Sequence, residues 1–399
     1  MGLKIAFVTP WYGANISGGT ESACRNLSER LRQSGVEVYV LTTCVKQFHS
    51  DWNVDYHKPG LEIINGVHVL RFSVRKRNVQ LFDSINAKLM KNISVSLNEE
   101  DAYLAESVNS PDLEKYLLGH KEQFDAFIFT PYMFGTTYHG VQQVYDKAIL
   151  FPAFHDESYA YFTRFKEVYS RVKGIIFNSI AEQEWAAAHY NFGCVHQKVI
   201  GLGVTDFKPI PGQFREKYKI PYPFILYAGR RDDGKNVDIL VDFFNRYKIN
   251  RPNSTLKLVL IGGGGGDRSY HSEDDIYDLG FVTEEDKYNA YGAAQVLCNP
   301  SSFESFSLVI MESWQAKRPV LVYEKCEVTK RFVEQSNGGL YFCQYDEFEA
   351  CLDLLLTHLN LGDALGNNGY SFVQSNFTWD CVIENYQRFI EACMDGEAK

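Results

Sequence analysis

The sequence lacks long apolar runs and an excess of positive charge. No apolar run reaches the roughly 18 residues that a membrane-spanning helix needs, and the one within MGLKIAFVTPW at residues 1–11 is too short for an export signal. Lysine and arginine number 40 against 50 aspartate and glutamate, which gives a net charge of −10. A chain of this charge is not generally attracted to phosphate backbones, so we expect no nucleic acid among its partners.

Cysteine is sparse and follows no pattern. The nine cysteines are scattered, their number is odd, and no two of them form C-x-x-C. This distribution indicates reduced thiols rather than a disulfide framework. Together with the missing export signal, it predicts a cytoplasmic protein.

Signatures of phosphate loops and metal sites are also missing. IGGGGGDRSY at residues 261–270 places five glycines after an apolar run, but it fits neither G-x-G-x-x-G nor the Walker loop. A flexible connector is therefore its default interpretation. The acidic stretches Asp232-Asp233 and 271–275 give neither D-x-D nor a histidine pair at helical spacing, and we interpret both as surface charge.

Short apolar runs alternate with helix-period segments along the whole chain. Runs that are apolar throughout are typical of strands covered on both faces, so they predict parallel sheets with crossover helices. The predicted strands cover residues 4–9, 37–42, 125–130, 148–153, 174–179, 198–203, 224–229, 256–262, 295–300, 318–323 and 338–342.

The alternation occurs twice, with a break near residues 201–214 where glycine and proline cluster. We therefore predict an α/β protein of two doubly wound, Rossmann-like domains, residues 1–203 and 204–375, which face a central cleft. Ligands of such folds bind at the carboxyl ends of the strands. Residues 43–122 are more polar and less regular, and inserts of this kind commonly vary with the bound partner.

Two glutamates flank a predicted helix start in SSFESFSLVIMESWQAKRPVLVY, residues 301–323. The helix is predicted to begin near residues 305–307 and to end before Pro319, so Glu304 precedes it and Glu312 lies one to two turns inside. Free N–H groups of the first turn and the helix dipole favour an anion beside Glu304. Since carboxylates accept hydrogen bonds from vicinal diols, the segment predicts a ligand with both phosphates and hydroxyls.

Here the chain resembles the family-4 retaining glycosyltransferases of the GT-B fold. Their hallmark is E-x7-E followed by a Pro-Val strand, as in Glu304, Glu312 and Pro319-Val320. Six further elements match in order, namely ISGGTES (16–22), FHDE (154–157), NS (178–179), GLGVTDFKP (201–209), YAGRRDDGKN (227–236) and the run 279–305. The resemblance covers most of residues 1–390 and weakens in 43–122. It implies the GT-B fold, with a last helix within 376–399 that crosses back to the first domain.

The resemblance also implies roles for the matched residues. Glu312 is expected to hold the ribose hydroxyls of a nucleotide sugar, and Glu304 those of the transferred hexose. Arg230 and Lys235 are expected to neutralise the diphosphate in place of a metal, and His155 to lie near the anomeric carbon. The other expected donor contacts are Gly18, Gly19, Gly229, Gly262, Gly263, Val282, Ser305, Phe306, Ser307 and Leu308.

Some positions depart from the family pattern. The usual E-G-F-G is Glu304-Ser305-Phe306-Ser307 here, and the two serines either add hydrogen bonds to phosphate or restrict the sugar that fits. Within the polyglycine stretch, Gly262 and Gly263 are expected to give the base and ribose access to the backbone. Residues 264–266 keep the interpretation of a mobile turn.

We therefore expect a retaining hexosyltransferase that needs no cofactor or metal. Its expected donor is UDP-glucose or UDP-N-acetylglucosamine, and its acceptor a saccharide or lipid-linked saccharide in polysaccharide biosynthesis. A GDP-mannose-dependent mannosyltransferase and a nucleotide-sugar epimerase on the same scaffold are the alternatives. The basic stretch 73–92 is interpreted either as a helix with one buried stripe or as a peripheral contact with anionic lipid on the inner face of the membrane.

Overall fold

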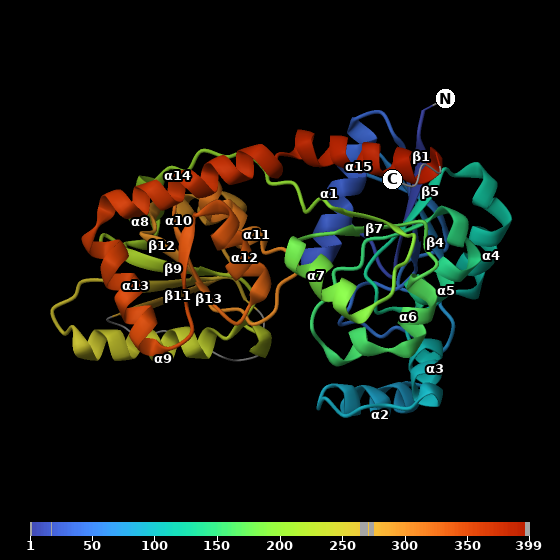
Figure 1. Ribbon diagram of the computed structural model, residues 1–399, viewed down its shortest axis with the longest axis horizontal. Helices are drawn as coiled ribbons and strands as arrows, with labels where there is room; N and C mark the ends of the chain where they lie inside the picture. Colours follow the sequence, from blue (N-terminus) through green and yellow to red (C-terminus); the bar gives the residue numbers. More distant parts are fainter. Residues whose placement is uncertain (1, 17, 264–269, 271–274, 396–399) are drawn as a thin grey trace. The chain divides into compact units, whose positions relative to one another are not determined.

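The computed structural model describes residues 2–16, 18–263, 270 and 275–395 (Figure 1). The chain forms two compact units, Met1–Gly201 with Val382–Lys399 as unit 1 and Leu202–Cys381 as unit 2. Each unit is an α/β domain with its own β-sheet and its own apolar core.

Unit 1 is built on an eight-stranded sheet in the order β3-β4-β2-β1-β5-β6-β7-β8, which is parallel except for the β3–β4 pair. Every residue of β5, β6 and β7 is buried, as expected for apolar strands that are covered on both faces. The strands outside the insert are β1 (Lys4–Thr9), β2 (Glu37–Thr43), β5 (Ala126–Phe129), β6 (Ala148–Leu150), β7 (Gly174–Phe177) and β8 (His196–Val199), and the helices are α1 (Gly19–Gln33), α5 (Gly135–Gln143), α6 (Thr163–Tyr169) and α7 (Ile180–His189).

Residues 43–122 are more regular than the sequence predicts. β3 (Gly60–Ile64) and β4 (Val67–Phe72) form an antiparallel hairpin that extends the sheet beyond β2. Three capped helices follow it, α2 (Val79–Leu89), α3 (Leu97–Glu106) and α4 (Pro111–His120), and α2 and α3 lie at the margin of unit 1 in Figure 1. β3 is an exposed edge strand, so no long apolar run marks the hairpin in the sequence.

Unit 2 contains a six-stranded parallel sheet in the order β11-β10-β9-β12-β13-β14. Its strands are β9 (Phe224–Ala228), β10 (Lys257–Ile261), β11 (Ile276–Gly280), β12 (Val296–Asn299), β13 (Val320–Tyr323) and β14 (Gly339–Phe342), and its helices are α8 (Pro211–Tyr218), α9 (Val237–Asn250), α10 (Glu284–Ala293), α11 (Leu308–Gln315), α12 (Glu327–Ser336), α13 (Tyr345–Thr357) and α14 (Leu359–Asn376). All of these strands except β11 lie within predicted ranges. β11 carries an aspartate and a terminal glycine, which hides it from a search for apolar runs.

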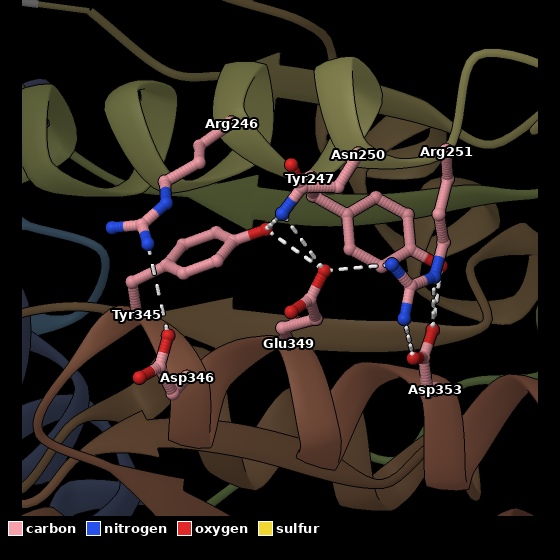
Figure 2. Close-up of polar contacts among 8 residues, drawn as sticks. All are labelled: Arg246, Tyr247, Asn250, Arg251, Tyr345, Asp346, Glu349 and Asp353. Atoms are coloured by element: carbon pink, nitrogen blue, oxygen red, sulfur yellow. Dashed lines mark hydrogen bonds and ion pairs between the residues drawn. The ribbon is translucent and has the colours of Figure 1, made fainter.

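Ion pairs and hydrogen bonds join α9 to α13 (Figure 2). Arg251 Nη1 lies 2.7 Å from Glu349 Oε1, and Arg251 Nε donates to Asp353 Oδ1 at 3.0 Å. The hydroxyls of Tyr247 and Tyr345 donate to the same two carboxylates. Since α9 leads the chain from β9 to β10, Arg251, which follows the last residue of α9, lies near the start of β10.

The last helix, α15 (Trp379–Asp395), begins in unit 2, and its residues from Val382 onward belong to unit 1. Within unit 1 it packs against β7. A Cβ atom added to Gly174 would lie 2.7 Å from Cys393 Sγ and 3.0 Å from Phe389 Cζ. The small residue in β7 therefore allows the helix to approach the sheet.

Candidate functional site

The predicted donor-binding residues of unit 2 lie at one edge of its sheet. All six strands run in the same direction, so the loops that follow them emerge at their carboxyl ends. The loops after β9, β10, β11 and β12 hold residues 229–236, 262–263, 281–283 and 300–307. Leu308 and Glu312 lie in α11, and Lys235 ends a short 3-10 helix, Asp233–Lys235, within the loop after β9.

Lys235 and Glu304 are in direct contact at this edge. Lys235 Nζ donates to Glu304 Oε1 at 2.7 Å, and the two side chains are 18% and 13% exposed. Asn236, whose backbone is left-handed (φ 50°), joins the two loops by donating from Nδ2 to the Pro300 carbonyl oxygen at 3.0 Å and to Ser302 Oγ at 2.5 Å. The structure thus brings together two predicted residues that come from loops after different strands.

Glu312 is held by two residues that the sequence analysis does not identify. Lys287 Nζ donates to Glu312 Oε1 at 2.6 Å, and the Tyr291 hydroxyl donates to Oε2 at 2.8 Å. Burial, reinforced by the charge of Glu312, holds the pKa of Tyr291 well above its usual value, so Tyr291 stays a neutral donor. Lys287 and Tyr291 are four residues apart on α10, a spacing that places both on one face of the helix.

The adjacent arginines of the loop after β9 have different surroundings. The Arg230 side chain is 67% exposed, and its Nε lies 3.3 Å from Asp232 Oδ2. Arg231 is buried, pairs with the buried Asp278 of β11 and donates to the Gly262 carbonyl oxygen at 3.1 Å. Burial acts to raise the pKa of Asp278, but hydrogen bonds from Arg231 and from backbone N–H groups outweigh it and hold the pKa below its usual value. Arg231 therefore links the loop after β9 to β11 and to the loop after β10. The Arg230 side chain, by contrast, is exposed to solvent.

The predicted glycines of unit 2 serve close backbone packing. Gly262 has φ 105°, its N–H donates to the Gly280 carbonyl oxygen at 2.7 Å, and a Cβ atom there would lie 2.1 Å from the Gly229 carbonyl oxygen. A Cβ atom at Gly263 would lie 2.4 Å from the ring of Phe281, which is 82% exposed. Val282 follows this ring and is half-buried. The expected mobile turn, residues 264–266, lies outside the described residues.

The helix after Glu304 begins slightly later than predicted, at Leu308. Ser305 is half-buried in the turn before it, and the ring of Phe306 packs against Phe332 and Phe377, so only the backbone of Phe306 is available to a ligand. Ser307 precedes the helix in a left-handed conformation (φ 79°), and its Oγ accepts a hydrogen bond from Asn299 Nδ2 at 3.0 Å. The serine hydroxyl is thereby tied to the end of β12.

The predicted glycine loop of unit 1 leads into α1. Gly18 has φ 142°, and a Cβ atom there would lie 2.0 Å from Glu21 Oε2, so the position requires glycine. Glu21 in turn accepts a hydrogen bond from Trp11 Nε1 at 2.9 Å. A Cβ atom at Gly19 would meet no atom within 4 Å.

His155 lies in the loop that follows β6, at the carboxyl edge of the sheet of unit 1. Its side chain is 36% exposed, and its Nδ1 lies 3.9 Å from Glu157 Oε1. The same oxygen accepts a hydrogen bond from the Tyr132 hydroxyl at 2.9 Å. Tyr132 and Glu157 thus fix the chain on one side of His155.

Buried Glu182 fixes the chain on the other side, and the sequence analysis does not identify it. Its two carboxylate oxygens accept hydrogen bonds from the backbone N–H groups of Phe154 at 2.7 Å and Asn178 at 2.6 Å. Burial raises the pKa of Glu182 to about 8, against the effect of these backbone donors. Ser179 caps α7 by accepting a hydrogen bond from the Glu182 N–H at 3.1 Å, and the S-x-x-E spacing is a signal that could have pointed to Glu182.

The middle of the basic stretch 73–92 forms a helix, α2, with one buried stripe. Phe82, Ile85 and Leu89 of α2 are buried. The Arg77 guanidinium lies over the rings of Trp52 and Phe82, and Lys88 pairs with Glu99. Among the described residues, no helix is long and apolar enough to cross a membrane.

Residues 212–372, which lie in unit 2, match the family model described as glycosyl transferases group 1. The whole chain is 24% identical to an uncharacterized glycosyltransferase of Methanocaldococcus jannaschii, in an alignment that covers 98% of this chain and 99% of the relative. The region that holds Lys235, Glu304 and Glu312 is therefore the region that the family model describes.

Two solved structures show the same fold. The chain is similar to sucrose-phosphate synthase from Thermosynechococcus elongatus, with a TM-score of 0.73, 17% identity and coverage of 99% of this chain and 100% of that one. It is also similar to HepE of Anabaena in complex with UDP and glucose, with a TM-score of 0.68, 14% identity and coverage of 98% and 100%. The fold is GT-B, as predicted, and together with the family match it shows that the chain is a glycosyltransferase.

Proposed function

We propose that the chain is a family-4 retaining glycosyltransferase that moves a hexose from a nucleotide-diphosphate sugar to a saccharide acceptor in polysaccharide biosynthesis, without a metal ion. The observation that carries this proposal is the pair of contacts at the carboxyl edge of unit 2, Lys235 with Glu304 and Lys287 with Glu312. A nucleotide sugar matches both chemistries, because its diphosphate attracts the cations and its hydroxyls donate to the carboxylates.

UDP-glucose and UDP-N-acetylglucosamine are the donors that we favour. The structural similarity to HepE, whose structure holds UDP and glucose, supports a UDP-sugar. In this proposal Glu312 accepts from the ribose hydroxyls and Glu304 from those of the hexose. Lys287 and Tyr291 then orient the Glu312 carboxylate through their hydrogen bonds to its two oxygens.

The charge of the leaving group is neutralised by this chain's own residues in the proposal. Negative charge grows on the diphosphate as its bond to the sugar breaks. The proposal is supported by the pairing of Lys235 with Glu304 and by the exposed Arg230 side chain in the same loop. Backbone N–H groups at the start of α11 add a further positive potential. These groups supply what a divalent metal supplies in other transferases.

The proposed reaction retains the configuration of the anomeric carbon. The acceptor hydroxyl attacks from the side of the departing diphosphate, whose oxygen takes the hydroxyl proton as the old C–O bond breaks and the new one forms. His155 holds a hydroxyl of the transferred sugar near that carbon. Glu304 and Glu312 accept hydrogen bonds and carry no proton in this scheme, unlike the acid–base pair of a glycosidase.

A panel of nucleotide sugars tests the proposal. Binding and slow hydrolysis of UDP-glucose, UDP-N-acetylglucosamine and GDP-mannose are measured with EDTA and with added Mg²⁺ or Mn²⁺. We expect a UDP-sugar to bind most tightly and to be hydrolysed equally in both conditions. Strong dependence on the metal would contradict the proposed role of Lys235 and Arg230, and release of an isomeric sugar nucleotide without an acceptor would indicate an epimerase.

A further inference from the structure

A cavity of about 330 Å³ lies in unit 1 next to His155. This volume is at the lower end of the range of about 300–1,000 Å³ that is typical of small-molecule sites. The chain after His155 forms one wall, with Asp156, Glu157 and Tyr161, and the end of α2 with the turn after it forms the other, with Leu89 and Ile93.

Hydrogen bonds hold the two walls together. Ser158 Oγ donates to Asn92 Oδ1 at 2.7 Å, and the Tyr159 hydroxyl donates to Asn86 Oδ1 at 2.7 Å. Both contacts join α2 and its C-terminal turn to the segment after His155. The insert of unit 1 thus shapes a preformed cavity.

The polar groups of the cavity are hydrogen-bond acceptors with negative charge. Asp156 Oδ1 accepts from the Tyr161 hydroxyl at 2.5 Å, and Glu157 Oε1 accepts from Tyr132. Among the described residues, none donates a hydrogen bond to Asp156 Oδ2 or Glu157 Oε2. None of the described lining residues is a lysine, arginine or histidine.

Two charged groups close to the cavity, Glu100 and Arg164, are already engaged with other residues of unit 1. Glu100, which is buried and also lines the cavity, accepts from the backbone N–H groups of Thr163 and Arg164 at 3.1 and 3.0 Å. The Arg164 guanidinium donates to Asp101 at 2.6 and 2.8 Å and to Glu167 at 3.0 Å. The described residues that line the cavity thus contribute three carboxylates and no cationic side chain.

We propose that this cavity binds the acceptor, and that the part of the acceptor inside it is an uncharged saccharide rather than a sugar phosphate. This inference rests on the proposed function. Sugar hydroxyls donate to Asp156 and Glu157, while the partly exposed ring of Tyr161 and the side chain of Ile93 offer apolar surface to the C–H faces of a sugar. A phosphate at the same place meets three carboxylates and, among the described lining residues, no cation, so the site discriminates by repulsion as well as by attraction.

Matched acceptor pairs test the inference. The pairs are glucose and glucose 6-phosphate, fructose and fructose 6-phosphate, and myo-inositol and its 1-phosphate, each offered with the nucleotide sugar that binds most tightly in the panel. Transfer is measured as nucleotide release above the hydrolysis rate. We expect kcat/KM for the best neutral acceptor to exceed that of its phosphate at least tenfold. Preference for the phosphate, or transfer to no member of any pair while the donor is still hydrolysed, overturns the inference and leaves the proposed function standing.

The double variant Asp156→Asn, Glu157→Gln separates charge from shape. We expect it to lower kcat/KM for the neutral acceptor about tenfold and to reduce the neutral-to-phosphate ratio at least threefold, because the repulsion is removed. An equal loss for both members would show a structural defect only and contradict the inference. Asp112→Asn on α4, which removes one acid of unit 1 outside the cavity, is the control and should leave the ratio unchanged. If no nucleotide sugar binds at all, the proposed function fails and this inference with it.

Discussion

The carboxyl edges of the two sheets are organised in different ways. In unit 2 lysines meet glutamates directly, as Lys235 meets Glu304 and Lys287 meets Glu312. In unit 1 backbone N–H groups converge on one buried carboxyl, Glu182, and the cavity beside His155 carries acids without a lysine. The charged pairs of unit 2 therefore combine cations and carboxylates, whereas the described residues that line the cavity of unit 1 contribute carboxylates and hydroxyls but no cation.

Among the variants that test this difference, replacement of Lys235 is expected to have the largest effect. We expect Lys235→Ala to lower kcat/KM for transfer about 1,000-fold, equivalent to about 4 kcal/mol, because the diphosphate loses its cation and Glu304 is left unpaired. Initial rates with the preferred donor measure this effect. Activity within about tenfold of the wild type would mean that Lys235 does not serve the diphosphate.

Arg251→Ala is the matched control for that variant. It removes a basic residue that also pairs with carboxylates in unit 2 (Figure 2), but at the end of α9 that leads to the start of β10. We expect the thermal stability of the protein to fall while kcat/KM per folded molecule stays unchanged. Equal losses of activity in both variants would attribute the Lys235 effect to general destabilisation.

The next largest effect is expected from the close backbone packing between the loops after β9 and β10 in unit 2. We expect Gly262→Ala to lower the free energy of unfolding by about 3 kcal/mol, because the added Cβ atom meets the Gly229 carbonyl oxygen and φ is 105°. Gly280 also has a left-handed backbone (φ 62°), but a Cβ atom there meets nothing within 4 Å. Gly280→Ala should therefore cost only about 1 kcal/mol. Equal costs in urea unfolding would show that conformation alone, and not the contact with Gly229, explains the glycine.

The sequence predicts those parts of the fold that are apolar throughout. The strands of unit 2 except β11 lie in predicted ranges, since buried parallel strands leave a continuous apolar run. β11 and the β3–β4 hairpin escape because they are exposed or interrupted by polar residues. An edge strand is hydrogen-bonded to one neighbouring strand only, and its other side faces solvent. Its sequence can therefore carry polar residues that a central strand excludes.

The candidate site shows a similar limit. The loop spacing and the resemblance place Lys235, Glu304 and Glu312 at one edge, but they do not reveal that Lys287 and Tyr291 hold Glu312. These residues lie on another helix, α10, and their contact depends on how α10 packs against α11. Likewise the cavity beside His155 depends on the packing of α2 against a segment far along the chain, since Asn86 and Tyr159, which are hydrogen-bonded, are 73 residues apart, and no local pattern encodes this contact.

The protonation of buried Glu182 in unit 1 makes the stability of the protein depend on pH. Burial raises the pKa of Glu182 to about 8, above the ordinary value of about 4.3 for an unfolded chain. The folded state therefore holds the proton between these two values, and the free energy of unfolding falls as pH rises through this window. Between pH 6 and pH 8 we expect a loss of about 2 kcal/mol in the wild type relative to Glu182→Gln, which does not titrate.

Denaturant unfolding of both proteins at several pH values measures this difference. Glu182→Gln also turns an amide donor towards a backbone N–H, so it is expected to be less stable at pH 6, and only the change with pH reports the titration. A constant difference from pH 6 to pH 8 would mean that the donors of Phe154 and Asn178 keep the carboxylate ionised throughout.

Replacement of Ser307 is expected to have the smallest effect on stability. It tests why this chain has serine where the E-G-F-G pattern has glycine. Its left-handed backbone costs on the order of 1 kcal/mol, while its Oγ accepts from buried Asn299. Ser307→Ala keeps the conformation and leaves the Asn299 amide unpaired, so we expect a loss of about 1–2 kcal/mol in thermal unfolding. Ser307→Gly loses the same hydrogen bond but relaxes the backbone, and should be about 1 kcal/mol more stable than the alanine variant. Equal stability of the serine and alanine proteins would show that the hydrogen bond to Asn299 does not offset the strain, and that serine is kept for contact with the ligand.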